Sequence, residues 1–208
     1  MTTYGIEIEC ASPVDQYGVR DALRGAGINA ITAGYSGREY SVWQVKTDVT
    51  IPTRRDLTHR IEVVSPVLTW GDLESLRQVR IVSEVLTALG CRVLRPRGSQ
   101  SAGFHTHVSM SDLAPGNLAA WFRSWHAQQD TTDSLVRSGR ERGGRHNAWC
   151  AVLSASMIDR CATAAGNGDA RALASAASGH NLAVNTQWFY ERGTIEIRQR
   201  DGAIHWQK

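Results

Sequence analysis

The sequence predicts an α+β fold in which helices pack on one face of an antiparallel β-sheet. Polar and apolar residues alternate in short segments near both ends of the chain, as they do in half-buried strands. Between these segments, apolar residues recur at the spacing of amphipathic helices. The chain has 208 residues, and because a domain typically holds about 150 residues, we expect a single domain spanning residues 1–208.

The first half of the chain contains most of the predicted strands. Residues 3–9 are predicted to form the opening strand, because isoleucine and glutamate alternate there. A short helix is expected at residues 15–25, with Asp15 as its N-cap. Further strands are expected at residues 41–46, 60–64, 91–94 and 104–109.

Three long helices and a closing β-hairpin complete the predicted fold. Helical spacing indicates a helix over residues 71–89, and Gly90 suits its end. Its expected apolar face consists of Leu73, Leu76, Val79, Val82, Leu86 and Leu89. Two more helices are expected at residues 118–136 and 149–164, and the strands of the hairpin at residues 181–190 and 193–200. Hairpins combined with long helices are typical of α+β folds.

The composition is that of a soluble globular protein. Hydrophobic residues make up 42% and charged residues 21%, which excludes a disordered or collagen-like chain. The net charge is +3, and of the 23 basic residues only Lys46 and Lys208 are lysine. The many arginines suit either phosphate binding or GC-rich codon usage. They are dispersed and form no basic stripe interleaved with aromatic residues, so we expect no nucleic acid partner.

We expect a cytoplasmic protein with no membrane partner. No segment approaches the ~18 consecutive apolar residues of a membrane span. The opening residues MTTYGIEIEC contain neither the basic nor the apolar region of a signal peptide. The four cysteines form no CxxC pair and are expected to be reduced, buried thiols.

Two carboxylates share one face of the opening strand. Glu7 and Glu9 stand at positions i and i+2, where two negative charges repel unless a cation or water separates them. The pattern suits Mg²⁺ or Mn²⁺, because these hard cations prefer oxygen ligands. The alternative is the solvent face of a half-buried strand.

Two histidines and a serine share one face of the strand at residues 104–109. His105, His107 and Ser109 alternate there with Phe104 and other residues of the opposite face. Imidazole nitrogens ligate metals or donate to phosphate. The alternative is a pair of unrelated surface histidines.

The last predicted strand places Glu196, Arg198 and Arg200 on one face. A carboxylate followed by two guanidinium groups is suited to bind a cation together with the anion that the cation bridges. A ladder of cross-strand ion pairs is the alternative.

Two further carboxylates stand at informative positions. Glu62 lies within an apolar strand, where a carboxylate is costly unless it is paired or bound to a metal. Asp48 follows the strand at residues 41–46 and suits either a site or a turn.

The order of these motifs resembles the amidoligase family, which is related to the glutamine synthetase and glutamate–cysteine ligase superfamily. The segments that carry the resemblance are YGIEIE, WQVKTD, IEVVSP, GFHTHVS, RHNAWC, HNLAVN and GTIEIRQRDG. They run from Tyr4 to about Ile204, nearly the whole chain. GFHTHVS and TIEIRQ are the most specific.

The resemblance implies a glutamine synthetase-like catalytic domain, with ATP and Mg²⁺ or Mn²⁺ held on the concave face of an antiparallel sheet. It implies an ATP-dependent carboxylate–amine ligase that activates a carboxylate as an acyl phosphate. An amine then displaces the phosphate and leaves an amide. The substrates would be small-molecule or peptide carboxylates and amines, such as an amino acid, a peptide or a cell-wall-like molecule.

By the same resemblance, five residues would bind metal. Glu62 would join Glu9 at one ion, and His105 and Glu196 would join Glu7 at another. Metal ions that bridge phosphate oxygens neutralise charge during phosphoryl transfer.

Other matching residues would contact the nucleotide. His107 and Ser109 would lie near it, Arg198 would contact the transferring phosphoryl group, and Arg200 would lie beside Arg198. Positive groups at this place stabilise the charge of the transition state.

The remaining matches concern the acceptor and a glycine-rich loop. Asp48 would hold the amine acceptor or a metal-bound water. Arg142 or Arg145 would reach phosphate or carboxylate from the loop before Asn147. The chain departs from the family where a basic residue usually precedes the Asn-Leu segment, since Gly179 and His180 stand there. It also ends soon after its last motif, so acceptor recognition is expected to involve a partner protein or a homo-oligomer.

Two other functions fit parts of the sequence. His105, His107 and Glu62 suit a zinc hydrolase, although the whole set is rich in carboxylates. A catalytically inactive nucleotide-binding module would also use the arginines.

Overall fold

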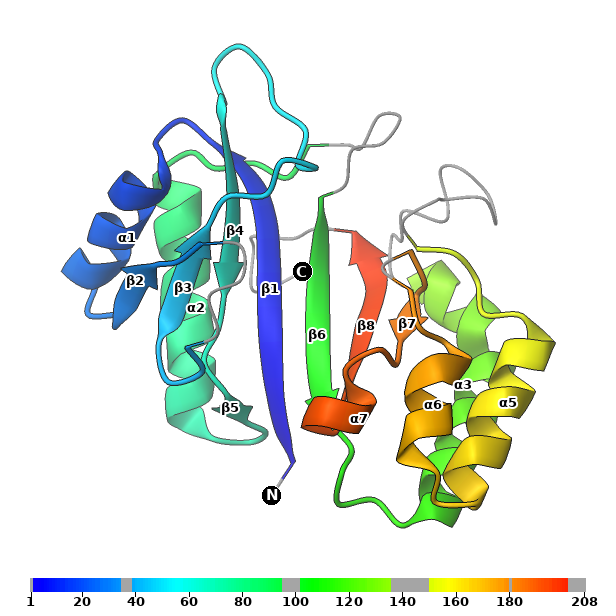
Figure 1. The fold of residues 1–208 in the computed structure, drawn as a ribbon. Coiled ribbons are helices and arrows are strands. Elements are labelled where there is room, and N and C mark those ends of the chain that lie inside the picture. Colours follow the sequence, from blue (N-terminus) through cyan, green and yellow to red (C-terminus); the bar gives the residue numbers. More distant parts are fainter. Residues whose placement is uncertain (1, 35–38, 95–101, 136–149, 180, 202–208) are drawn as a thin grey trace. The chain divides into compact units, whose positions relative to one another are not determined.

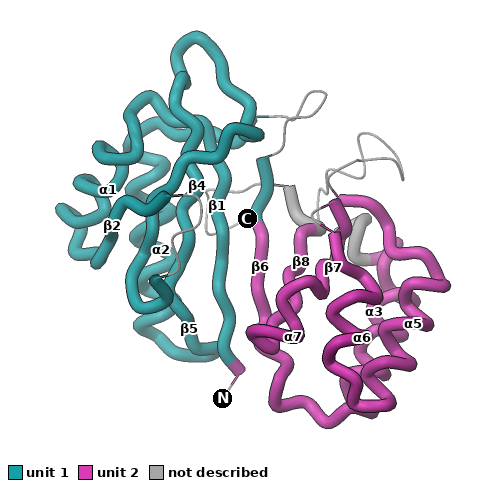
Figure 2. Tube along the Cα trace, viewed as in Figure 1, with its two compact units in different colours: residues 1, 3–104, 202–208 teal, residues 2, 105–201 magenta. Residues whose placement is uncertain are grey.

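The computed structural model describes residues 2–34, 39–94, 102–135, 150–179 and 181–201. They form two compact units, with unit 1 built on residues 3–104 and unit 2 on residues 105–201 (Figure 2). Each unit combines strands with helices, which confirms the predicted α+β class. The expectation of a single domain stays a prediction.

Unit 1 contains two helices beside a set of paired strands (Figure 1). Its elements are β1 (Thr3–Ser12), α1 (Gln16–Gly25), β2 (Ala30–Thr32), β3 (Trp43–Lys46), β4 (His59–Val64), β5 (Leu68–Thr69) and α2 (Leu73–Ala88). The strands follow the order β2-β3-β4-β1, and β5 pairs with the start of β1. β2 and β3 run parallel and the other pairs antiparallel. The strands are therefore mixed but mostly antiparallel, and the predicted antiparallel sheet is confirmed except for the β2–β3 pair.

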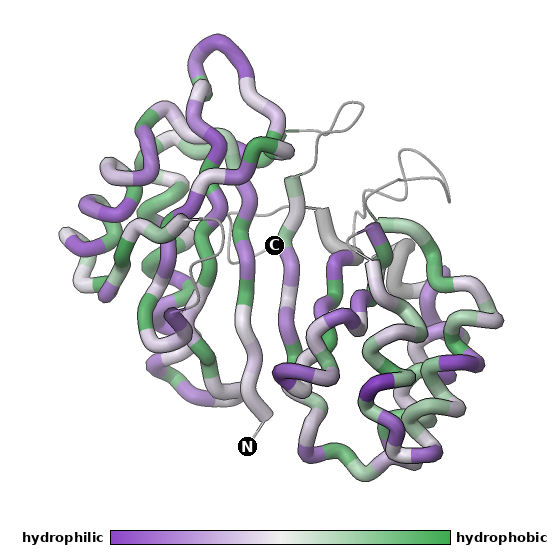
Figure 3. Tube along the Cα trace, viewed as in Figure 1, coloured by the Kyte–Doolittle hydropathy of each residue, from purple (hydrophilic) through white to green (hydrophobic). Residues whose placement is uncertain are grey.

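The core of unit 1 lies between one face of these strands and the two helices. Ile6 and Ile8 of β1 are 3% and 2% exposed and belong to the same buried cluster as Val82 of α2. Hydrophobic and hydrophilic segments alternate along β1 (Figure 3). Successive side chains of a strand point to opposite faces, so Glu7 and Glu9 lie on the face away from this core.

Both helices of unit 1 begin at a capped N-terminus. The Asp15 carboxylate accepts a hydrogen bond of 2.8 Å from the N–H of Gly18, which confirms the predicted cap. Asp72 accepts one of 2.7 Å from the N–H of Ser75. These bonds satisfy N–H groups that the first turn leaves free.

The predicted apolar face of α2 is only partly buried. Val82 and Leu86 are fully buried, whereas Leu73 and Leu76 are 81% and 53% exposed. Leu73 lies about 180° from Val82 around the helix axis and faces away from the core, whereas Ser75 of the same turn is buried. The predicted face is therefore wrong at its N-terminal end.

Unit 2 contains the remaining helices and strands. From the boundary onward the elements are β6 (Gly103–Ser109), α3 (Pro115–Leu135), α5 (Ala155–Gly166), α6 (Ala170–Ala176), β7 (Val184–Asn185), α7 (Phe189–Arg192) and β8 (Thr194–Asp201). The strands follow the order β6-β8-β7, and β7 pairs antiparallel with β8. In the core, Ile195 of β8 packs in one buried cluster with Phe122 of α3 and Ile158 of α5. Glu196, next to Ile195, therefore points to the other face of β8.

Two predicted elements are shorter than expected. The helix predicted at residues 149–164 begins only at Ala155, because the Ser154 hydroxyl caps it by accepting a hydrogen bond from the N–H of Met157. The strand predicted at residues 91–94 is reduced to a single bridge between Arg92 and Ala11.

The predicted closing hairpin is present in a modified form. Within residues 181–190 only Val184–Asn185 is a strand, and the short helix α7 leads into β8 in place of a tight turn. Gly193 ends α7 in the left-handed region, with φ of 64°, which glycine adopts without a steric cost.

Candidate active site

A row of charged side chains crosses three strands of unit 1. The register pairs Glu9 of β1 with Glu62 of β4, and Glu62 with Lys46 of β3. Directly opposed residues share a face of the sheet, so two carboxylates and an ammonium lie side by side. Glu7 lies two residues from Glu9 on the same face of β1. The structure thus brings together three of the five predicted metal ligands: Glu7, Glu9 and Glu62.

Glu62 is a strongly perturbed carboxyl of this row. Burial and the negative charge of Glu7 raise its pKa to about 8, against the opposing effect of Lys46; Glu9 and Asp48 raise it further. Burial and like charges both disfavour the ionised form of a carboxyl. A divalent cation would remove this repulsion, and the donors here are the carboxylate oxygens that Mg²⁺ and Mn²⁺ prefer. The residues therefore fit such an ion.

Glu9 is held by the backbone of Gly103, which also belongs to unit 1. Its Oε2 accepts a hydrogen bond of 2.6 Å from the N–H of Gly103, and only 3% of the residue is exposed. A buried, oriented carboxylate is suited to ligate an ion because its position is fixed in advance.

Asp48 forms a local turn after β3. Its Oδ1 accepts hydrogen bonds from the N–H and the hydroxyl of Thr50, at 2.8 and 2.7 Å. This is the turn that sequence reasoning weighed against a site. Asp48 also acts electrostatically on Glu62, so it lies near the acidic row.

A second cluster, in unit 2, is centred on Glu196. The Arg198 Nη1 donates to Glu196 Oε1 over 2.6 Å, and His105 Nδ1 lies 3.6 Å from the same oxygen. The latter distance suits an ion pair but is too long for a hydrogen bond. His105 and Glu196 are 3% and 4% exposed. The structure therefore joins the predicted His105, Glu196 and Arg198 in one buried group.

Asn185 completes this cluster and was not predicted. Its Nδ2 donates to Glu196 Oε2 over 2.9 Å. Its Oδ1 accepts from the backbone N–H of Gly179 at 3.2 Å and of Gln187 at 3.0 Å. Asn185 is fully buried, and it stands opposite Glu196 in the β7–β8 register. It therefore fixes the orientation of the Glu196 carboxylate.

Two other candidates lie on the histidine strand. His107 and Ser109 occupy alternate positions of β6 after His105 and are half-buried. The Ser109 Oγ lies 3.4 Å from the Ser111 hydroxyl. Their predicted contacts with a nucleotide stay a prediction.

Some predicted residues lie outside what the structure describes. Arg200 belongs to β8, but its side chain is outside the described part. Arg142, Arg145 and His180 are outside the described residues altogether. Gly179 is described, and its N–H is one of the two that Asn185 binds.

The comparison with protein families concerns the whole chain. A family model described as "Putative amidoligase enzyme" matches residues 1–208. The chain belongs to this family. The resemblance inferred from the motifs is thus confirmed, and an amidoligase is by its description a ligase. No curated protein matches the chain.

Two further sequence predictions concern the amidoligase chain as a whole. All four cysteines are buried, as expected. Within the described ranges, no helix has both the length and the apolar character that crossing a bilayer requires.

Proposed function

We propose that this amidoligase is an ATP-dependent carboxylate–amine ligase that works through an acyl phosphate. The observation that carries the proposal is the Glu196 cluster, in which one buried carboxylate contacts an imidazole and a guanidinium. A metal ligand beside an arginine suits a phosphate that carries its own metal ion. Family membership supports the ligase class.

Each unit supplies at least one carboxylate ligand for Mg²⁺ or Mn²⁺. In unit 1, Glu9 and Glu62 would hold one ion, with Glu7 next to them on β1. In unit 2, Glu196 and His105 would hold another. When bound, such ions neutralise phosphate oxygens and so lower the barrier to phosphoryl transfer.

The arginines and the residues assigned to the nucleotide would contact the phosphate groups directly. Arg198 donates a hydrogen bond through Nη1 to Glu196. This bond fixes the orientation of its planar guanidinium group. A guanidinium held in this way stabilises the charge that develops on a transferring phosphoryl group. We assign His107, Ser109 and Arg200 to the nucleotide.

The proposed reaction has two steps. A substrate carboxylate oxygen attacks the γ-phosphorus of ATP and ADP leaves, which forms the acyl phosphate. The amine nitrogen then attacks the acyl carbon, inorganic phosphate leaves and the amine loses a proton. We assign Asp48 and Arg145 to the positioning of the amine and of the acyl phosphate.

Phosphate release tests this proposal. The chain is incubated with ATP, Mg²⁺ and pools of amino acids and peptides, alone and in pairs. We expect release that requires a carboxylate and an amine together, and a loss of about 100-fold or more in Glu9→Gln and Glu196→Gln, as for the removal of an electrostatic contact to the transition state. Glu84→Gln, on the exposed side of α2, is the matched control and should retain full activity.

Other outcomes would contradict the proposal. Full activity in both site variants would refute the site assignment. Stoichiometric zinc with hydrolysis of an amide and no stabilisation by ATP would favour a hydrolase. ATP binding with no turnover on any pair would favour an inactive nucleotide-binding module.

A further inference from the structure

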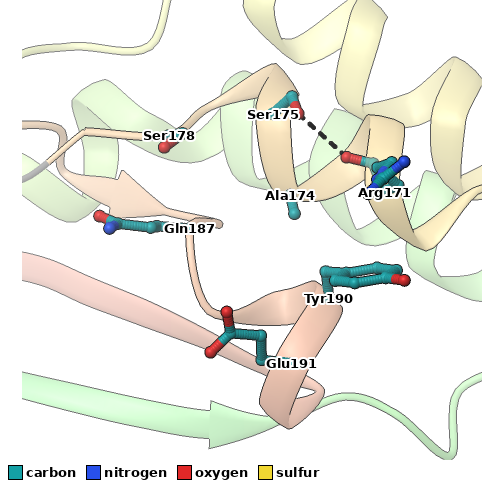
Figure 4. A pocket seen from close by; sticks show the side chains of 7 residues that line it. All are labelled: Arg171, Ala174, Ser175, Ser178, Gln187, Tyr190 and Glu191. Atoms are coloured by element: carbon teal, nitrogen blue, oxygen red, sulfur yellow. Dashed lines mark hydrogen bonds between the residues drawn. The ribbon is translucent and has the colours of Figure 1, made fainter.

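Unit 2 contains an open polar pocket that none of the motifs explains. Its volume is about 410 Å³, and it lies between α6, α7 and the segment around β7. Charged and polar side chains line it: Arg171, Ser175, Ser178, Gln187, Tyr190 and Glu191 (Figure 4). A cavity of this size accommodates a small molecule.

The pocket contains one positive and one negative side chain, and they are kept apart. The Arg171 guanidinium of α6 lies 5.5 Å from the centre of the Tyr190 ring. Figure 4 shows the Glu191 carboxylate at the other end, directed from α7 towards the segment that carries Gln187. Among the described residues no ion pair is formed by Arg171 or Glu191. Two separated, opposite charges suit a ligand whose own charges are separated.

One end of the pocket is connected to the Glu196 cluster. The N–H of Gln187 donates to Asn185 Oδ1, and the Asn185 amide donates to Glu196. Gly179, next to Ser178, donates to the same Oδ1. The wall of the pocket that contains Ser178 and Gln187 is therefore hydrogen-bonded to the Asn185 side chain, which in turn orients Glu196. A ligand end bound at this wall would contact residues whose backbone N–H groups or neighbours are joined to Glu196 through Asn185.

We propose that this pocket binds a zwitterionic, peptide-like molecule. Its ammonium would lie at the end with Glu191 and Gln187, and its carboxylate would pair with Arg171. Ser175 and Ser178 supply hydroxyls for the peptide group between them. A single α-amino acid holds its two charges on adjacent atoms, so the separated charges of the pocket favour a dipeptide or a longer ω-amino acid.

The inference deepens the proposed ligase function and rests on it in one respect. The wall at the amine end of the bound molecule is hydrogen-bonded through Asn185 to Glu196, so the molecule would be the amine substrate of the ligase. Binding itself requires neither ATP nor metal, and it is therefore measured separately from turnover.

Titration with alanyl-alanine tests the pocket. Backbone amide shifts of the full ¹⁵N-labelled chain are followed without ATP or metal, using alanyl-alanine, its N-acetyl form, its C-terminal amide and the doubly blocked form. We expect saturable shifts at Ser178, Gln187 and Tyr190, and about five-fold weaker binding when either charge is blocked, as for one partly exposed ion pair.

Charge-removing variants assign each end of the ligand. In Glu191→Gln the N-acetyl form should bind as well as the free dipeptide, and in Arg171→Gln the amide should. Asp159→Asn on α5 and Arg123→Gln on α3, both exposed, are controls that should keep the full preference for the zwitterion.

Three results would overturn the inference. They are the absence of saturable shifts at the pocket, equal binding of all four forms, and loss of the preference in the control variants. If binding is seen but no ATP-dependent turnover, the pocket stands and the ligase proposal fails. If turnover is seen and the KM for the amine is unchanged in Glu191→Gln and Arg171→Gln, the pocket assignment fails alone.

Discussion

Glu62 combines burial with a surplus of negative charge. Its pKa is raised to about 8, chiefly by burial and by Glu7, so in the metal-free protein it holds a proton near neutral pH. A carboxyl in the unfolded chain has an ordinary, lower pKa, and the folded state therefore binds this proton more tightly. The stabilising contribution is complete at low pH and is lost as the pH rises towards 8.

The stability of the metal-free protein should therefore fall between about pH 5 and about pH 8. The loss should be a few kcal/mol, since each pKa unit corresponds to about 1.4 kcal/mol. Urea unfolding with a chelator present measures it. Glu62→Gln should flatten the dependence, whereas Glu84→Gln should leave it unchanged. Parallel curves for the wild type and Glu62→Gln would contradict the assignment.

Asn185 is the residue on which the Glu196 cluster most depends. Replacing it with alanine leaves two partly buried backbone N–H groups and one buried carboxylate oxygen without their bonds. Each such group costs about 1–3 kcal/mol, so Asn185→Ala should destabilise the chain by about 2–4 kcal/mol in urea unfolding. The exposed Asn181→Ala should change the stability by less than about 0.5 kcal/mol. A loss below about 1 kcal/mol for Asn185→Ala would show that the amide is not structural.

The sequence predicted the faces of single residues better than their partners. Alternation placed Glu7 with Glu9 and Glu196 with Arg198, because side-chain direction follows directly from strand geometry. It could not find Lys46 or Asn185. Their importance comes from the register of β3 with β4 and of β7 with β8, which depends on residues far apart in the chain.

The element that positions Glu196 is β8 together with the turn before it. Gly193 has a positive φ, and a Cβ on it would lie 2.5 Å from the Ser111 Cβ. Its carbonyl accepts the N–H of Met110. The connection between α7 and β8 therefore requires glycine for both its backbone angle and its space.

Gly193→Ala should destabilise the protein by about 1–3 kcal/mol, the usual cost of a strained backbone residue. The matched control is Gly25→Ala at the end of α1, where a Cβ meets nothing within 4 Å and the change should be neutral or slightly stabilising. Thermal unfolding compares the two variants. Equal effects would mean that the turn tolerates a side chain.

The shortest helices and strands could not be predicted from the sequence, for a physical reason. β7 has two residues, α7 four and α6 seven, too few for a helical or strand period to repeat clearly. The long helices α2 and α3 were found, but the burial of α2 was not. Leu73 stands 13 residues before Leu86, about 140° away around a helix of 3.6 residues per turn, so it faces away from the core.

For the whole molecule, the order of motifs was the strongest signal. No single motif distinguishes a metal site from a polar strand face, but their sequence along the chain identified the family, and the family match over residues 1–208 confirms it. The α+β class followed from periodicity. Neither the composition nor a linker-like segment indicated the division into two units. The reason is that the two units are defined by contacts between residues far apart in the sequence.

The transfer of ¹⁸O from a carboxylate to phosphate tests the central claim most directly. The chain is given ATP, Mg²⁺ and a mixture of amino acids whose carboxylates carry ¹⁸O, and the products are analysed by mass spectrometry. An acyl phosphate intermediate predicts ¹⁸O in the inorganic phosphate, together with an amide that has lost one labelled oxygen. Label in AMP would show adenylate chemistry instead, and formation of ADP with only unlabelled phosphate would contradict the ligase.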